Sequence, residues 1–156
     1  MTSAVRIVAL ALVASAFVFN APLFSARADA MVEPLDIITS TGTHRYQVEV
    51  ANDNASRERG LMYRHEMPAN HGMLFEFPTR APVTFWMKNT YLPLDMVFID
   101  ADGTVRGVYQ HAAPLSEKLI SSGVAVVAVL EINADQAFDI HLKPGDKVRF
   151  PFFHSK

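Results

Sequence analysis

Two carboxylates of the sequence lie at the ends of apolar segments. Asp95 opens the run from Leu94 to Ile99, and Glu131 comes near the end of the long apolar run 124–132. A carboxylate at the rim of an apolar core either pairs with a cation or has a raised pKa. If it is paired, it is part of a structural network, and if one partner is free, it can do acid–base chemistry. The candidate catalytic residues are Asp95, Glu131, Lys88 and Arg64.

A second chemical feature is the stretch FWMKNTYLPLD, which ends at Asp95 and contains the only tryptophan of the chain. In a strand, Trp86 and Lys88 lie on one face, opposite to Phe85. An indole beside an ammonium group can form a binding surface. In the alternative interpretation, a loop or the alkyl stem of Lys88 covers Trp86. The candidate ligand-binding residues are Trp86, Lys88, Asn89, Thr90, Asp95 and Arg64.

The polar residues of this stretch are expected to lie where the strand leaves the core. Asn89 and Thr90 also favour a turn, because asparagine tolerates the left-handed conformation. We expect Lys88, Asn89 and Arg64 to be able to reach the two carboxylates. Whether such a cluster is structural or functional stays open at this level.

Metal and nucleophile signals are weak. Thioethers and imidazoles can bind copper, but methionine usually fills the core, and the six histidines have no ligand-like spacing. We predict neither a metal site nor a cofactor. The chain has no cysteine, so it has no thiol nucleophile and no disulfide, and no serine lies in a G-x-S-x-G motif.

The N-terminus has the pattern of a secretory signal peptide over residues 1–30. Arg6 precedes an apolar run, 7–19, that is shorter than the ~20 residues of a membrane span. Ala28-Asp29-Ala30 fits a cleavage site, and cleavage before Asp29 is also possible. An uncleaved anchor is the alternative. We expect a periplasmic or secreted protein in which residues 31–156 form one β-rich domain without stable membrane insertion.

The charge balance disfavours nucleic acid as a partner. Without Arg6, Arg27 and Asp29, the 14 basic and 16 acidic residues of the chain fall to 12 and 15. There is no basic surplus, so we expect a small molecule or an envelope component as the partner. The oligomeric state stays open.

Short apolar runs separated by turn residues predict a mostly β protein. The expected strands are 35–39, 45–51, 72–77, 83–87, 94–99, 104–109, 124–132 and 147–150, and the expected short helices are 55–63 and 134–140. Thr41-Gly42 and Asp102-Gly103 predict hairpin turns, Pro78 is expected to stop a strand, and Asn133 is expected to cap the second helix. No βαβ rhythm is visible. The pattern favours a compact antiparallel β-barrel or sandwich with one or two short helices.

Several segments together resemble domain-of-unknown-function family 192, small bacterial and archaeal proteins that are often exported. The resemblance rests on R-G-L-M followed by Arg64, then G-M-L-F, F-W-M-K-N-T, P-L-D, Glu131 and Gly145-Asp146. It covers the chain from about residue 37 to residue 150. It implies a compact β-barrel-like fold and no established activity. The chain departs from the family pattern after Glu131, where the usual glycine is absent.

Three functions remain open on this basis. The favoured hypothesis is a non-catalytic binding module of the cell envelope for a small molecule, a glycan or a protein partner. The second is a hydrolase or lyase with Asp95 or Glu131 as acid or base and Lys88 or Arg64 stabilising an anion. The third is a periplasmic copper-handling protein that uses methionine and histidine.

Overall fold

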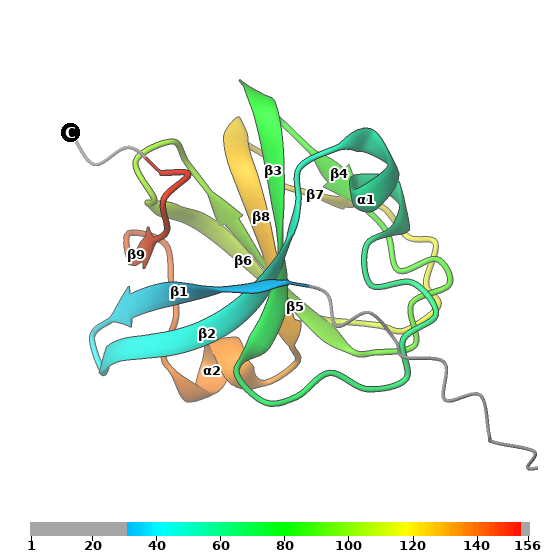
Figure 1. Ribbon diagram of the computed structural model, residues 1–156, viewed down its shortest axis with the longest axis horizontal. Helices are drawn as coiled ribbons and strands as arrows, with labels where there is room; N and C mark the ends of the chain where they lie inside the picture. Colours follow the sequence, from blue (N-terminus) through cyan, green and yellow to red (C-terminus); the bar gives the residue numbers. More distant parts are fainter. Residues whose placement is uncertain (1–30, 154–156) are drawn as a thin grey trace, which may run out of the picture.

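The computed structural model describes residues 31–153 and is dominated by one curled sheet (Figure 1). The predicted signal peptide, residues 1–30, lies outside the described residues. The strands are β1 (Val32–Thr39), β2 (Gly42–Ala51), β3 (His71–Ala81), β4 (Thr84–Phe85), β5 (Leu94–Ile99), β6 (Val105–Ala112), β7 (Ile120–Ser121), β8 (Val126–Asn133) and β9 (Lys147–Arg149), and the helices are α1 (Asn54–Arg59) and α2 (Gln136–Asp139). The predicted mostly β fold is therefore confirmed. No helix in this part of the chain is long and apolar enough to cross a bilayer.

Seven strands follow the order β6-β5-β8-β3-β2-β1-β9, and β4 pairs separately with β7. The two ends of the seven-stranded order meet, because the backbone N–H of Val105 donates to the carbonyl of Asp146 at 2.9 Å and Val148 donates to Gly103 at 2.8 Å. These bonds give the sheet its barrel-like form. Gly103 is required at this closure, since a Cβ there would lie 2.3 Å from the Val148 carbonyl oxygen.

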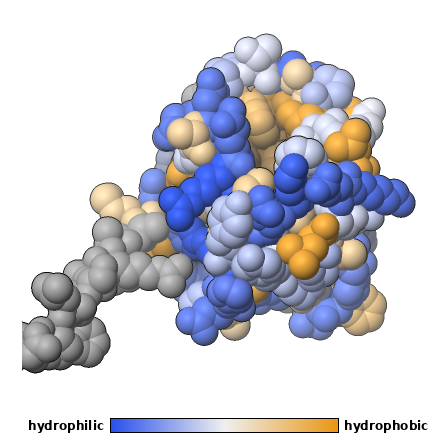
Figure 2. Space-filling model, turned by 90° about the vertical axis from the view of Figure 1, so that its right-hand side faces the viewer, coloured by the Kyte–Doolittle hydropathy of each residue, from blue (hydrophilic) through white to orange (hydrophobic). Residues whose placement is uncertain are grey.

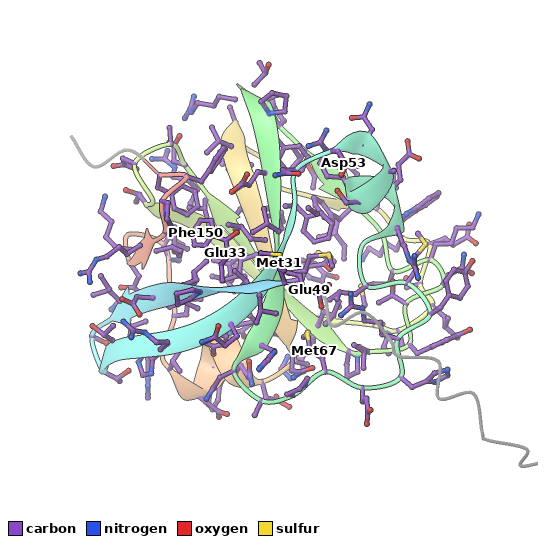
Figure 3. All side chains as sticks on the ribbon, in the orientation of Figure 1. Met31, Glu33, Glu49, Asp53, Met67 and Phe150 are labelled. Atoms are coloured by element: carbon purple, nitrogen blue, oxygen red, sulfur yellow. The ribbon has the colours of Figure 1, made fainter. Side chains whose placement is uncertain are left out.

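The sheet has a separate apolar core on each face. The barrel interior holds residues such as Leu74, Val97 and Leu130. The outer face holds Phe75, Met96 and Val129, and other residues of that cluster come from β4, β7 and the loops around them. Figure 3 shows Phe150 in the half of the molecule that carries β9, and Asp53 at the start of α1 in the other half. Strand β5 is buried along its whole length because both of its faces are covered.

The hairpin turns are confirmed, but several local expectations are wrong. Strand β3 continues through Pro78, because pairing with β2 has ended at Phe75 and the register with β8 shifts between Glu76 and Ala81. The missing N–H of Pro78 therefore interrupts no regular ladder of hydrogen bonds between strands. Of the expected strand 83–87, only Thr84–Phe85 is paired with another strand, β7. The expected alternation of exposed and covered side chains is nevertheless present over residues 83–87.

The other errors concern the helices and their connections. Helix α1 ends at Arg59, because Gly60 has a φ of 47°. The side chain of Asn133 does not cap α2 but donates to the carbonyls of Met67 and Pro68 at 3.0 and 3.2 Å. Strands β2 and β3 are parallel, so α1 lies in a βαβ crossover that the sequence did not indicate. Helix α1 buries none of its residues, so its sequence has no apolar periodicity that would indicate packing against a sheet.

Candidate functional site

A cavity of about 360 Å³ lies between α1, β3, β4 and β8 on the outer face of the sheet. We call it the Glu131 cavity. Its lining residues are Asn54, Arg57, Glu58, Arg59, Gly60, Leu61, Met62, Phe75, Phe77, Val83, Thr84, Phe85, Trp86, Thr90 and Glu131. Figure 2 views the molecule from the side that carries α1, β4 and β7, where apolar surface lies among hydrophilic side chains. The cavity thus combines aromatic and aliphatic side chains with polar and charged ones.

Glu131 is the buried carboxyl group of this cavity. Its side chain belongs to β8, and its register partners are Met73 on β3 and Met96 on β5, so both methionines lie on its face of the sheet. Only 5% of the residue is exposed. Burial raises the pKa of Glu131 to about 8, and within residues 31–153 no hydrogen bond or ion pair offsets that cost. The carboxyl group is therefore largely protonated at neutral pH.

Aromatic rings form the walls of the cavity. The ring of Phe85 packs edge-on against Phe75 at 5.2 Å and against Phe77 at 6.3 Å. Trp86 is 44% exposed, and the ammonium group of Lys88 lies 5.0 Å from the centre of its ring. The predicted aromatic–cation pair is therefore present, and a loop does not cover the indole. Lys88 itself does not line the cavity.

Charged side chains of α1 lie at the cavity mouth. Arg57 donates to the carbonyl of Glu76 at 2.8 Å and to the Asn54 side chain at 2.7 Å, and its guanidinium lies 5.8 Å from the centre of the Phe77 ring. Its hydrogen bonds hold Arg57 at the edge of the cavity. Glu58 and Arg59 are exposed. Helix α1 is fixed by a capping box between Asp53 and Ser56.

Asp95 lies on the opposite face of the sheet from Glu131. In the β5–β8 ladder Met96 is opposite Glu131, so the preceding residue points into the barrel interior. Asp95 is fully buried and accepts hydrogen bonds from the backbone N–H groups of His111 at 2.9 Å and Ala137 at 3.0 Å. The carboxylate thereby joins β6 to the start of α2. The structure does not bring the two predicted carboxylates together.

The predicted cations also lie away from both carboxylates. Arg64 forms a bidentate ion pair with Glu49, in which Nη2 of Arg64 donates to Oε2 of Glu49 at 2.6 Å. Lys88 lies 4.0 Å from the carboxylate of exposed Glu117. The expectation that Lys88 and Arg64 reach Asp95 or Glu131 is therefore wrong, because each has a nearer acidic neighbour.

The Lys88-Asn89-Thr90 segment forms the expected turn. The N–H of Thr90 donates to the carbonyl of Met87 at 3.0 Å, and Asn89 has a φ of 56°. The Asn89 amide donates to the hydroxyl of Tyr63 at 2.9 Å, so it is occupied by a structural contact. Thr90 is buried and lines the Glu131 cavity.

Of the residues predicted from the sequence, Trp86, Thr90 and Glu131 therefore share one cavity. Sequence reasoning missed the phenylalanine walls and the contribution of α1. Phe75 and Phe77 lie on either side of Glu76 in β3, and they resemble ordinary core positions until the fold leaves space beside them.

No metal-binding cluster is recognisable in the described residues, since no three of their histidine, aspartate and glutamate side chains are grouped in a way that could hold an ion. The buried methionines Met73, Met87 and Met96 pack with the apolar cluster of the outer face. The Glu131 cavity therefore offers aromatic walls, one buried carboxyl group and the charged side chains of α1.

Comparisons with known proteins agree with this fold. A solved Sinorhizobium meliloti 1021 structure, described as a candidate transcription regulator, is 49% identical with a TM-score of 0.74 and covers 76% of this chain and 92% of its own. A Novosphingobium aromaticivorans DSM 12444 structure of unknown function is 35% identical, with a TM-score of 0.74. The match covers 76% of this chain and 85% of that chain. The search of curated proteins found no match. The model of the DUF192 family, described as "Uncharacterized ACR", matches residues 36–150, and the chain belongs to this family.

Proposed function

We propose that the protein is a binding protein for a small molecule that enters the Glu131 cavity. The observation that carries this proposal is the carboxyl group of Glu131, which is buried in an aromatic-walled cavity and has no hydrogen-bonding or charged partner among residues 31–153. Pockets of this kind, apolar with a few convergent polar groups and a perturbed pKa, are the usual form of ligand sites.

The energetic cost of Glu131 supports the proposal. A buried carboxyl group normally has a hydrogen-bonding or charged partner, because burial without one destabilises the fold. Asp95, the other fully buried carboxylate discussed above, has two backbone donors. Glu131 has none among the described residues. A costly side chain that faces a cavity is typical of a functional position, where a ligand supplies the missing partner.

A binding role is favoured over the hydrolase or lyase hypothesis by the arrangement of the candidate residues. The expected acid–base mechanism combines Asp95 or Glu131 with Lys88 or Arg64 as the cation that stabilises an anion. Asp95 is on the opposite face, and Arg64 is bound to Glu49. A binding site needs only Glu131 and the walls that surround it.

The proposal includes a location outside the cytoplasm. It is supported by the N-terminal pattern of residues 1–30, with Arg6, an apolar run and Ala28-Asp29-Ala30. The ligand would then be a component of the periplasm or of the surrounding medium. Fractionation of cells, with N-terminal sequencing of the protein recovered from the periplasm, tests this part.

Trp86 offers a direct test of binding, because it is the only tryptophan and lines the cavity. Fluorescence titrations should cover envelope sugars, peptidoglycan fragments, amino acids, amines and cuprous ion. Compounds that change the emission are then followed by NMR of isotope-labelled methionine methyl groups. A ligand in the cavity should shift the signal of Met62, which lines the cavity, and leave the exposed Met31 unchanged. Met73 and Met96, next to Glu131, report on the buried side of the site. Saturable binding without a shift at Met62 would place the site elsewhere and refute the proposal.

A further inference from the structure

The Glu131 cavity combines two features that recognise positive charge. Its base holds a carboxyl group, and its walls present the rings of Phe75, Phe77, Phe85 and Trp86. Aromatic faces attract cations through their quadrupole, and cages of such rings are a known solution for binding methylated ammonium groups. The hydrocarbon part of a ligand would also be buried favourably against the same rings.

No cation of the described chain neutralises Glu131. The charged groups that face the cavity are Arg57, Glu58 and Arg59, all from α1 at its mouth. Strands β3 and β5 place the uncharged Met73 and Met96 beside it. Strand β4 contributes Thr84 and Phe85 to the lining, and the turn after it contributes Thr90, so neither adds a charge. Asp95 points into the barrel interior. Burial is the only cause of the raised pKa of Glu131, which means that the arginines at the mouth do not offset it.

We propose that the ligand of the Glu131 cavity is an organic cation, an amine or quaternary ammonium group on an apolar body of modest size. The positive group lies against the Glu131 carboxylate, and the apolar body lies against the phenylalanine and tryptophan rings. This inference rests on the proposed function and specifies the chemical class of its ligand. The cavity volume of about 360 Å³ accommodates a body of the size of a substituted benzyl group.

Proton release is the signature of this arrangement. Glu131 is largely protonated at neutral pH, because burial raises its pKa to about 8. A cation binds the ionised form, so binding expels a proton and becomes stronger as pH rises. A neutral hydroxyl or amide would bind the protonated acid equally well or better. An anion would be repelled by the ionised form, so its affinity would fall as pH rises.

The direction of the pH dependence therefore identifies the ligand class. A matched probe series consists of benzyltrimethylammonium, benzylammonium, benzyl alcohol and benzoate, measured by isothermal titration calorimetry between pH 6 and pH 8. The quaternary ammonium does not titrate, so its pH dependence reports the protein alone. The fraction of Glu131 that is ionised, and with it the affinity for this probe, should increase roughly 50-fold over that range. Titrations in buffers of different ionisation enthalpy should show proton release approaching one per cation at pH 6.

Two variants separate charge from shape. Glu131→Gln preserves the size and hydrogen bonding of the protonated acid but cannot ionise, so it should lose cation binding and its pH dependence. Glu66→Gln makes the same chemical change at an exposed glutamate that does not line the cavity, and it should retain the pH dependence and the affinity. Methionine methyl spectra of both variants verify that the fold is intact.

The outcomes distinguish this inference from the proposed function. If benzyl alcohol or benzoate shifts the methyl signal of Met62, which lines the cavity, and neither cation does, the cavity binds small molecules but not cations. The inference is also overturned if cation affinity is independent of pH, or if Glu131→Gln binds cations as well as the natural protein. If neither these probes nor the wider panel shifts the Met62 signal, both the inference and the proposed function fail.

Discussion

Replacement of Glu131 by glutamine should stabilise the protein at neutral and alkaline pH. The pKa of this carboxyl group is 4.5 in a model compound and about 8 in the fold, with burial as the cause. Between these two values the unfolded chain is ionised and the folded chain holds the proton. The protonated Glu131 carboxyl group makes its full contribution to the stability of the fold below pH 4.5, and this contribution is lost as pH rises toward 8. Glutamine has nearly the same shape and does not ionise, so the variant escapes this loss.

The expected magnitude follows from the distance between the pH and the unfolded pKa. Each pH unit in the interval 4.5–8 changes the free energy of unfolding by about 1.4 kcal/mol. The stability gain of the variant over the natural protein should therefore increase by about 3 kcal/mol between pH 4.5 and pH 7. It should level off near about 5 kcal/mol above pH 8. Burial of the residue is nearly complete, so solvent screening does not reduce this figure much.

Urea denaturation at a series of pH values measures the effect. The quantity of interest is the difference in free energy of unfolding between the variant and the natural protein at each pH, because the other titrating groups then cancel. A difference of about 3 kcal/mol corresponds to a shift of at least about 1 M in the urea midpoint for a domain of this size. Glu58→Gln, with an exposed side chain, is the control and should show no such trend.

Two results would refute the reasoning. A stability difference that does not change between pH 5 and pH 8 would mean that Glu131 is not held protonated by the fold. A variant that becomes less stable as pH rises would mean that the ionised carboxylate has a favourable partner. Either result would remove the main support for the Glu131 cavity as a ligand site.

Three further predictions concern other parts of the molecule. Asp95→Asn should cost about 2–3 kcal/mol of unfolding free energy in urea titrations, since an amide can accept from only one of the two backbone N–H groups that the carboxylate binds; an unchanged midpoint would rule out the structural role. Gly103→Ala should destabilise the barrel closure by at least about 2 kcal/mol, because its φ is 76° and the new Cβ would meet the Val148 carbonyl; thermal unfolding tests this, and equal melting temperatures would contradict it. The emission of Trp86 should be readily quenched by acrylamide, and more so in Lys88→Ala, since the indole is 44% exposed beneath the ammonium group; a protected, blue-shifted emission would show that the ring is core.

The sequence by itself determined most local structure of this protein. Alternating side chains predicted the β2 strand, and the boundaries of β5 agree with the structure, 94–99. Asp102-Gly103 predicted the turn between β5 and β6. These features depend on backbone preferences of a few adjacent residues, and such preferences can be read directly.

Only the tertiary structure decided which candidate residues meet. Asp95 lies at the start of one apolar run and Glu131 near the end of another, so their sequence surroundings look alike. In the β5–β8 ladder, however, Met96 pairs with Glu131 and Asp95 pairs with Ile132. A shift of one residue reverses the face of every side chain, and this register is set by contacts far apart in the chain. It gives Asp95 two backbone donors inside the barrel and places Glu131 in a cavity on the other face, where no described residue is its partner.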